Sequence, residues 1–348
     1  MKKALIIIAA LILIYFLGPT PDKPQYINDL PEVPPTADAL ENYVANLEQK
    51  HKIKPDNNAE IVWANDDKTK TEYAVVYLHG FSASRVEGYP THRRFADYFG
   101  CNLYLARLSD HGIDTTDALY NFTAERLWQT AKEAYAIGKQ LGDKVIIMST
   151  STGGTLAVLL GAHYPDIAAL VNFSPNIEIN DPAAFMLNEP WGLQIARLVF
   201  GGKTRSVESD SIYEKYWYDT YRLEAIVELQ ELVETACTEE NFQKVSCPVF
   251  NGVYYRDEEH QDPVVRVAAI RQMHQELGTP DSLKVFKEFP FANTHVIASD
   301  IKSETVDDVF DAVKSFGIEK LKMKTRLEKL REMKTLQEET KADTVKNS

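Results

Sequence analysis

Short, mainly apolar runs alternate with longer stretches of helical periodicity over most of the chain. Tyr73–Leu78, Val145–Thr150 and Ile167–Phe173 have the composition of strands buried on both faces of a sheet. Ala124–Leu141 and Thr155–His163 place apolar residues at helical spacing between and after those runs. Strands that alternate with helices predict an α/β fold with a mainly parallel central sheet flanked by helices.

This alternation stops between residues 176 and 246. The interval is too long for a simple connection, and it carries helical patterns at Trp191–Phe200 and Leu223–Ala236. We expect it to form a helical cap over the sheet and to supply part of an apolar pocket. Its aromatic residues are Phe185, Trp191, Phe200, Tyr213, Tyr216, Trp217, Tyr218 and Tyr221.

The N-terminus has a different pattern. Lys2 and Lys3 precede an unbroken apolar run from Ala4 to Leu17. The run is shorter than the ~20 residues of a full membrane span, and no small-residue cleavage site follows it. Residues 1–18 are therefore predicted to be a signal anchor or an inefficiently cleaved signal peptide. The two lysines would remain cytoplasmic, and the rest of the chain would be membrane-anchored or exported on the extracytoplasmic side.

Composition also separates the two ends from the body. Prolines recur through residues 19–36, which predicts an extended tether. Residues 37–316 form the predicted folded domain. Residues 317–348 are dense in charge, which predicts a charged helical or disordered tail, with contact to an anionic membrane surface as the alternative.

The most informative motif follows the run Val145–Thr150. Ser151 comes directly after it, and Gly153 and Gly154 open the next helical pattern. A strand, a tight turn and a helix with small neighbours is the arrangement that presents a nucleophilic serine above a sheet. The usual pattern is Gly-x-Ser-x-Gly, and here Ser149 occupies the first position. If Ser149 were the nucleophile, Ser151 would stand where a glycine is needed, so Ser151 is preferred.

Two later loops carry the partners that an activated serine requires. His295 follows the strand-like run Leu283–Phe289 and is the predicted base, because imidazole titrates near neutrality. The acid should lie in the loop after the run that begins at Cys247. Asp262 is favoured because it leads into the next helical pattern, and Asp257, nearer the strand, is the alternative.

An upstream loop supplies the remaining part of the pattern. The run that ends at Leu78 leads directly into His79-Gly80. In a hydrolase of this layout, the backbone N–H groups of Phe81 and Thr152 would stabilise the oxyanion. His79 is expected to shape the loop rather than to act as a base.

Together these motifs resemble the α/β-hydrolase superfamily, in its serine esterase and lipase branch, which includes monoacylglycerol-lipase-like and serine-aminopeptidase-like members. The resemblance covers roughly residues 58–316. The segment Asn102–Gly112 is similar to the strand and loop that ends in Gly-His-Gly in monoacylglycerol-lipase-like members, with Asp110 in place of the first glycine and His111 shaping the loop. The resemblance implies these roles: Ser151 nucleophile, Asp262 acid, His295 base, Phe81 and Thr152 oxyanion donors.

The expected activity is hydrolysis of small carboxylic esters through an acyl-enzyme intermediate. A serine peptidase or an acyltransferase on the same site is the alternative among enzymes, and an inactive hydrolase-like binding module at the cell surface is the alternative of another class. The net charge of −13 argues against nucleic-acid binding. No cofactor or metal is expected, because the sequence lacks a phosphate loop, a dinucleotide fingerprint and zinc-ligand spacing. The sequence leaves the oligomeric state open.

Overall fold

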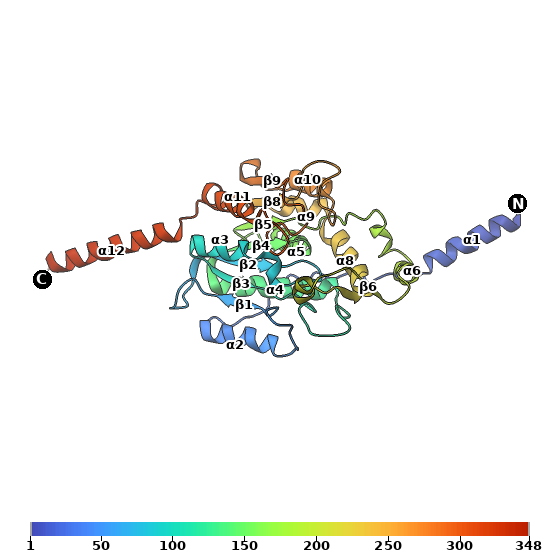
Figure 1. Cartoon of the computed structure of the whole chain (residues 1–348), viewed down its shortest axis with the longest axis horizontal. Helices are drawn as coiled ribbons and strands as arrows, with labels where there is room; N and C mark the ends of the chain where they lie inside the picture. Colours follow the sequence, from blue (N-terminus) through green and yellow to red (C-terminus); the bar gives the residue numbers. More distant parts are fainter. Residues whose placement is uncertain (1, 347–348) are drawn as a thin grey trace.

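The computed structural model describes residues 2–346, with side chains at residues 2–335 and 338–340, and its centre is a seven-stranded sheet (Figure 1). The strand order is β1-β3-β2-β4-β5-β8-β9, and every pair is parallel except β1 with β3. The prediction of a mainly parallel α/β sheet is thereby confirmed. The strands are β1 Glu60–Val62, β2 Thr71–Leu78, β3 Asn102–Leu105, β4 Gly142–Thr150, β5 Ala169–Phe173, β8 Val249–Val253 and β9 Lys284–Glu288.

Helices cover both faces of this sheet. Alternate side chains of β2 point to opposite faces, so Val76 joins the hydrophobic core under α4 and α5, whereas Val75 joins the core under α3 and α11. The bounds of these helices are α3 Thr91–Phe99, α4 Ala124–Leu141, α5 Thr152–His163 and α11 Val306–Glu319. The core beneath α4 and α5 also receives side chains from α2 Ala37–Glu48, α8 Leu223–Ala236, α9 Glu239–Lys244 and α10 Val267–Glu276.

The interval expected to form a cap has two structural parts. From residue 177 to 222 it consists of loops and short elements outside the sheet, whereas α8 lies against α5 and α4 and buries one face in the main core. The short elements are η2 Ala184–Met186, α6 Gly192–Val199, α7 Ser211–Tyr216 and the two-stranded hairpin of β6 Thr204–Ser206 with β7 Thr220–Arg222.

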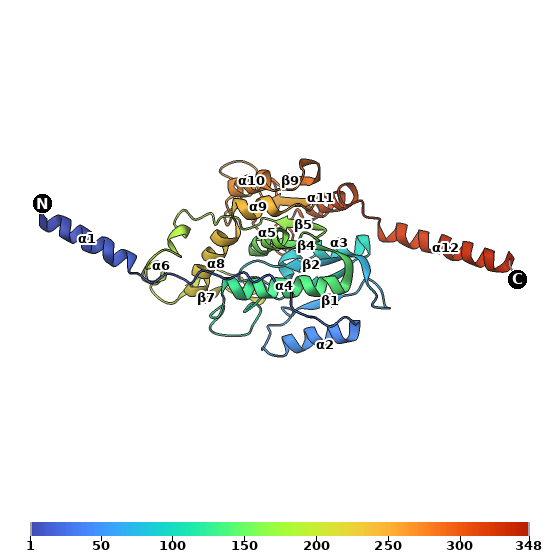
Figure 2. The same cartoon turned by 180° about the vertical axis from the view of Figure 1, so that it is seen from behind.

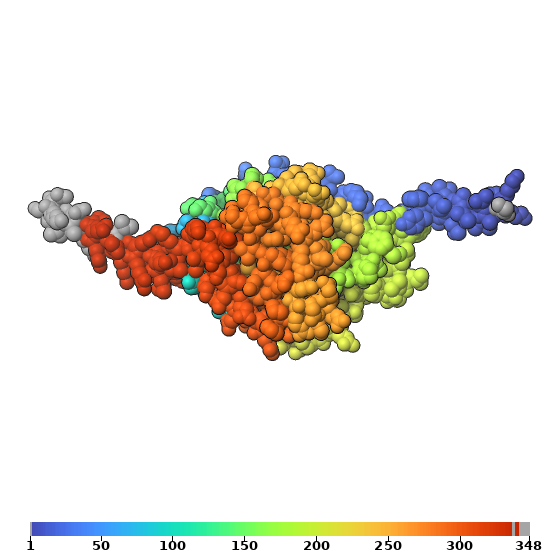
Figure 3. Space-filling view, turned by 90° about the horizontal axis from the view of Figure 1, so that it is seen from above, coloured from blue at the N-terminus to red at the C-terminus, as the bar shows by residue number. Residues whose placement is uncertain are grey.

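The two terminal helices, α1 Lys2–Phe16 and α12 Arg326–Lys346, project from opposite ends of the body (Figures 1 and 3). Within residues 2–346, none of the helices combines the length and the apolar character that a bilayer span requires.

The proline-rich segment between α1 and α2 has no helix and crosses the body beside α4 (Figure 2). Its backbone accepts hydrogen bonds from the body, with Trp128 Nε1 donating to the carbonyl of Ile27 at 2.9 Å and the Tyr164 hydroxyl to that of Asn28 at 2.6 Å. The segment is extended, as its composition indicates, and it is hydrogen-bonded to the domain at several positions.

Candidate active site

Ser151 occupies the sharp turn between β4 and α5. Its φ of 53° and ψ of −119° are a conformation that non-glycine residues rarely adopt. The turn is held on both sides, because the Ser151 N–H donates to the carbonyl of Phe173 at 3.0 Å and the Ser151 carbonyl accepts from Asn176 at 2.9 Å. The surrounding backbone thus stabilises the strained nucleophile elbow that the motif indicates.

Small residues around the elbow have a visible steric reason. A Cβ on Gly153 would lie 2.1 Å from the carbonyl oxygen of Leu78, so no larger residue fits there. Ser149 replaces the usual glycine without conflict, since its hydroxyl donates to Asn172 Oδ1 at 2.8 Å across to β5. That bond and complete burial leave Ser149 unsuited to act as the nucleophile.

His295 and Asp262 form a direct pair. His295 Nδ1 donates to one carboxylate oxygen of Asp262 at 2.7 Å, and the other oxygen accepts the N–H groups of Val264 and Val265 at 2.9 and 3.1 Å. Asp262 is 0% exposed. Burial raises its pKa, but the charge and hydrogen bond of His295 and the two amides outweigh burial, so the pKa of Asp262 is lowered and the carboxylate is ionised.

The alternative acid, Asp257, lies elsewhere. Its side chain is exposed and accepts hydrogen bonds from His260 Nδ1 at 2.7 Å and from the Glu259 N–H at 3.0 Å within its own loop. The structure therefore brings Asp262, and not Asp257, to His295. Whether the pair acts in catalysis stays a prediction.

The second nitrogen of His295 is free to accept a proton. Within the described residues, buried Nε2 has no hydrogen-bond partner. Burial lowers the pKa of His295, but the charge and hydrogen bond of Asp262 and the charge of Glu87 outweigh it, and the net pKa is raised above the ordinary 6.5. An imidazole with Nδ1 donating to a carboxylate and Nε2 unpaired has the tautomer that a general base requires.

The expected oxyanion donors lie beside the elbow. Thr152 is the first residue of α5, so its N–H has no intrahelical partner and lies at the positive end of the helix dipole. Phe81 follows β2, where Gly80 lies against the nucleophile: a Cβ on Gly80 would be 2.9 Å from Ser151 Cβ. In the described part of the chain, neither the Phe81 N–H nor the Thr152 N–H donates to another group.

Two buried histidines shape the loop around Phe81. His79 Nδ1 donates to the Gly80 carbonyl at 2.9 Å, while its Nε2 accepts the Leu108 N–H at 3.1 Å. His111 Nε2 accepts the Ser82 N–H at 3.1 Å. Burial lowers the pKa of both rings, that of His111 to about 4, so both are neutral and join two loops through their nitrogens.

Asp110 occupies the position of the first glycine in the Gly-His-Gly pattern, and its backbone shows how a non-glycine residue fits there. Its φ is 63°, the left-handed region that a glycine adopts most easily. Its carboxylate accepts two hydrogen bonds from Arg126 at 3.0 and 3.2 Å, which helps to hold this backbone conformation.

Residues from the interval between 176 and 246 pack beside the site. Trp217, just after α7, forms an apolar cluster with Ala83 of the oxyanion loop and Val296, the neighbour of His295. Ser151 and His295 are consequently only 6% and 9% exposed. The same region contains Glu87, a buried carboxyl that the sequence pattern did not single out, because it lies in a polar loop with nothing to signal its burial.

Comparison with known proteins supports the fold. No family model matches the chain. It is 25% identical over 191 residues to a thermostable monoacylglycerol lipase of Bacillus sp. (strain H-257), which is 54% of this chain and 71% of the lipase. A metagenome-derived lipolytic enzyme superposes with a TM-score of 0.60 at 17% identity, covering 76% of this chain and 98% of that enzyme.

A further solved structure, the monoacylglycerol lipase of Paleococcus ferrophilus, has a TM-score of 0.53 at 16% identity and covers 73% of this chain and 95% of the lipase. The chain has the α/β-hydrolase fold, which is the fold that the resemblance implies. The relatives named here are lipases and lipolytic enzymes.

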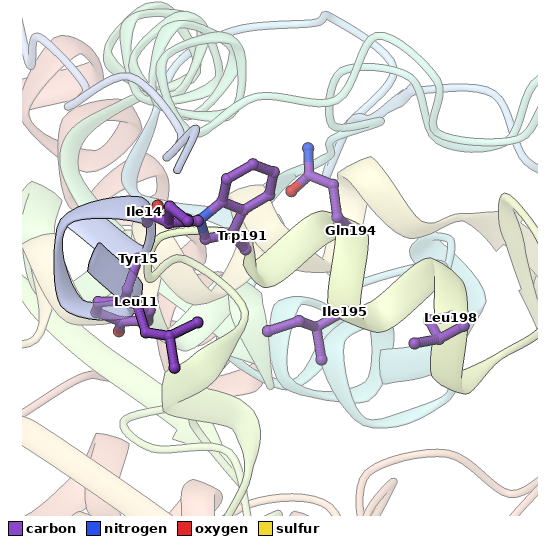
Figure 4. A pocket seen from close by; sticks show the side chains of 7 residues that line it. All are labelled: Leu11, Ile14, Tyr15, Trp191, Gln194, Ile195 and Leu198. Atoms are coloured by element: carbon purple, nitrogen blue, oxygen red, sulfur yellow. The ribbon is translucent and has the colours of Figure 1, made fainter. Parts of the chain in front are cut away.

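The protein also has an apolar groove away from Ser151, between α1 and α6 (Figure 4). Trp191 Nε1 donates to the carbonyl of Ile14 at 3.0 Å and joins the two helices. None of the predicted catalytic residues lines the groove, whose lining residues are Leu11, Ile14, Tyr15, Trp191, Gln194, Ile195 and Leu198.

Proposed function

We propose that this hydrolase cleaves carboxylic esters through a covalent acyl-enzyme intermediate on Ser151. The observation that carries the proposal is the buried pair of Asp262 and His295, which leaves Nε2 of the imidazole unpaired in a site that also contains a strained serine elbow. Esters are favoured over peptides because the relatives named above are lipases and lipolytic enzymes. A peptidase or an acyltransferase would use the same groups.

The proposed reaction has two steps. His295 Nε2 takes the proton of the Ser151 hydroxyl as the oxygen attacks the ester carbonyl, and the N–H groups of Phe81 and Thr152 stabilise the oxyanion. The imidazolium then gives its proton to the leaving alcohol. In the second step the same imidazole activates a water molecule, which releases the carboxylic acid and frees Ser151.

Reaction with a fluorophosphonate probe, followed by mass spectrometry of the adduct, tests this proposal. We expect labelling at Ser151, loss of labelling in His295→Ala, and retained labelling in Ser149→Gly, which restores the common motif. The labelled enzyme should hydrolyse p-nitrophenyl esters faster than matching amides. A folded wild-type protein that stays unlabelled would favour the inactive binding module instead.

We also propose that the enzyme works at a lipid surface, with its catalytic domain outside the cytoplasm. The apolar side chains of α1 are exposed on all sides of the helix, and α6 exposes Leu198 to 82% beside it. A helix without a polar face is stable only when something apolar covers it. Lys2 and Lys3 before the apolar run favour a cytoplasmic start of the chain.

Flotation with phosphatidylcholine and phosphatidylglycerol vesicles tests the lipid contact. The full chain should float with the vesicles, a chain beginning at Pro19 should stay behind, and Leu198→Ser should weaken binding. Flotation of the shortened chain as strongly as the full chain would contradict a role for α1. Protease treatment of intact cells should digest the catalytic domain if it faces outward.

A further inference from the structure

A second buried carboxyl lies next to the predicted nucleophile. Glu87 is 2% exposed and accepts the Gly80 N–H on Oε2 at 2.5 Å. A Cβ on Gly80 would lie 2.9 Å from Ser151 Cβ and 3.0 Å from both carboxylate oxygens of Glu87. The carboxyl, the Gly80 backbone and the nucleophile are thus packed directly against one another.

The groups around Glu87 come from four parts of the chain. The indole of Trp217, just after α7, favours its ionised form, and His295 interacts with it electrostatically. The other titratable groups that face it are Tyr77 of β2 and Tyr213 of α7. Burial raises the pKa of Glu87 to about 7, although the Gly80 amide, His295 and Trp217 all favour the ionised form.

Burying a carboxylate costs folding free energy unless hydrogen bonds or opposite charges compensate for the lost hydration. Here the contact is with the N–H of Gly80, which belongs to the His79–Gly80 peptide, so the carboxylate holds the backbone directly before the Gly80–Phe81 peptide that carries the Phe81 N–H toward Ser151. Because the oxyanion forms beside Ser151, a small rotation of that peptide would move the Phe81 N–H away from it. A displacement of about 1 Å in such a site can reduce the rate by about 10²-fold.

We propose that Glu87 is a positioning residue of this site: its carboxylate holds the Gly80–Phe81 turn against Ser151 and provides a second negative charge, besides Asp262, that faces His295. The inference rests on the proposed serine-hydrolase function. It assigns Glu87 two measurable effects, one on the rate of the chemical step and one on the pH at which His295 loses its proton.

The test compares Glu87→Gln with the wild type in ester hydrolysis over pH 5–9. Glutamine is uncharged and replaces one carboxylate oxygen with an NH2 group, which can donate a hydrogen bond but cannot accept the Gly80 N–H. We expect kcat to fall by about 10-fold or more with little change in KM, because the geometry of the oxyanion donor is degraded. The midpoint at which kcat/KM falls on acidification (the acidic limb) should move to lower pH. Without the negative charge of Glu87, the pKa of His295 should be lower.

Glu228→Gln is the matched control. Glu228 is also a partly buried carboxyl whose pKa is raised by burial, and it accepts a backbone N–H, from Ala124 at 3.3 Å, but it lies on α8. We expect it to leave kcat and the acidic limb unchanged. If Glu87→Gln does not fold, Trp217→Phe keeps a ring between Ala83 and Val296 and removes a donor that favours ionised Glu87, so it should shift the limb in the same direction.

Probe labelling separates the two levels of the proposal. A wild type that labels at Ser151, together with a folded Glu87→Gln variant of unchanged kcat and unchanged limb, overturns the role of Glu87 alone. A fall in kcat without a shift in the acidic limb of kcat/KM overturns the proposed effect of Glu87 on the pKa of His295. A wild type that neither labels nor hydrolyses esters overturns the proposed function, and this inference with it.

Discussion

Asp262 has the environment of a residue that must stay charged. It is completely buried, yet its two oxygens accept hydrogen bonds from one imidazole and two backbone amides. Together these donors lower its pKa despite burial. Asp257, in the same loop, is exposed and satisfied by His260.

Replacing each acid by asparagine should separate these two residues. Asp262→Asn should reduce kcat on the order of 10⁴-fold, because the amide can present a donor to Nδ1 and so favour the wrong tautomer of His295. Asp257→Asn should change kcat by less than about 2-fold. Steady-state hydrolysis of a p-nitrophenyl ester measures both, and equal losses in the two variants would contradict the assignment.

The pH dependence of the wild type follows from His295. The base must be neutral at Nε2, and the fraction of neutral imidazole falls as the pH falls through its pKa. Because the pKa of His295 is raised above 6.5, activity should be lost on acidification at a midpoint above 6.5. The profile of kcat/KM reports this value for the free enzyme. A rate that stays flat down to pH 5 would exclude His295 as the base.

Single residues differ in how far the sequence alone could place them. Ser151 and His295 stand next to strands in a fixed order, so pattern and chemistry were enough to single them out. The choice between Asp262 and Asp257 needed coordinates, because one loop contains both. Glu87 could not be found at all, since the groups around it, among them Trp217 and His295, come from distant parts of the chain.

At the level of elements, a chain of buried polar side chains joins three neighbouring strands to a helix. Ser149 of β4 donates to Asn172 of β5, which donates to Asn251 of β8 at 2.9 Å, and Asn251 pairs with His274 of α10 at 2.9 Å. This polar network begins two residues before Ser151, the predicted nucleophile, so it links the position of the elbow to the register of the sheet.

Truncating Asn172 should therefore destabilise the sheet. Asn172→Ala leaves the Ser149 hydroxyl and Oδ1 of Asn251 without a partner, and each unsatisfied buried group costs about 1–3 kcal/mol, so we expect a loss of roughly 2–5 kcal/mol. Asn58→Ala, which removes one local bond to the Ala59 carbonyl, should cost less than about 1 kcal/mol. Urea unfolding measures both. Equal midpoints would show that the polar chain adds no stability.

Elements with a strong local pattern were predicted well. Helix α4 has the predicted bounds, Ala124–Leu141, because its apolar periodicity is long and Thr123 caps its first turn by accepting the Arg126 N–H. The β6–β7 hairpin was not anticipated. Its strands have only three residues each, which is too short for an alternation of apolar and polar residues to mark them.

At the scale of the whole molecule, the proline-rich segment from residue 17 to 36, called the strap below, packs against the folded domain. It connects exposed α1 to α2 and lies over residues of α4 and α8 on the way. Lys23 pairs with Glu231, whose side chain is completely buried in α8, at 2.9 Å. Composition indicated an extended tether, but it could not show these contacts, because each involves residues more than a hundred positions away.

Two truncations should therefore have different effects. A chain beginning at Pro19 loses α1, whose side chains are exposed, and the single hydrogen bond from Trp191 to the Ile14 carbonyl, so its free energy of unfolding should fall by no more than about 1 kcal/mol. A chain beginning at Thr36 also loses the hydrogen bonds of the strap, at about 1 kcal/mol each, and the apolar contacts of Tyr26, Leu30 and Val33 with the core. We expect a loss of roughly 3 kcal/mol or more, visible as a lower urea midpoint. If the two truncated chains unfolded at the same midpoint, the strap would be a passive linker, and its contacts with α4 and α8 would contribute nothing to the stability of the domain.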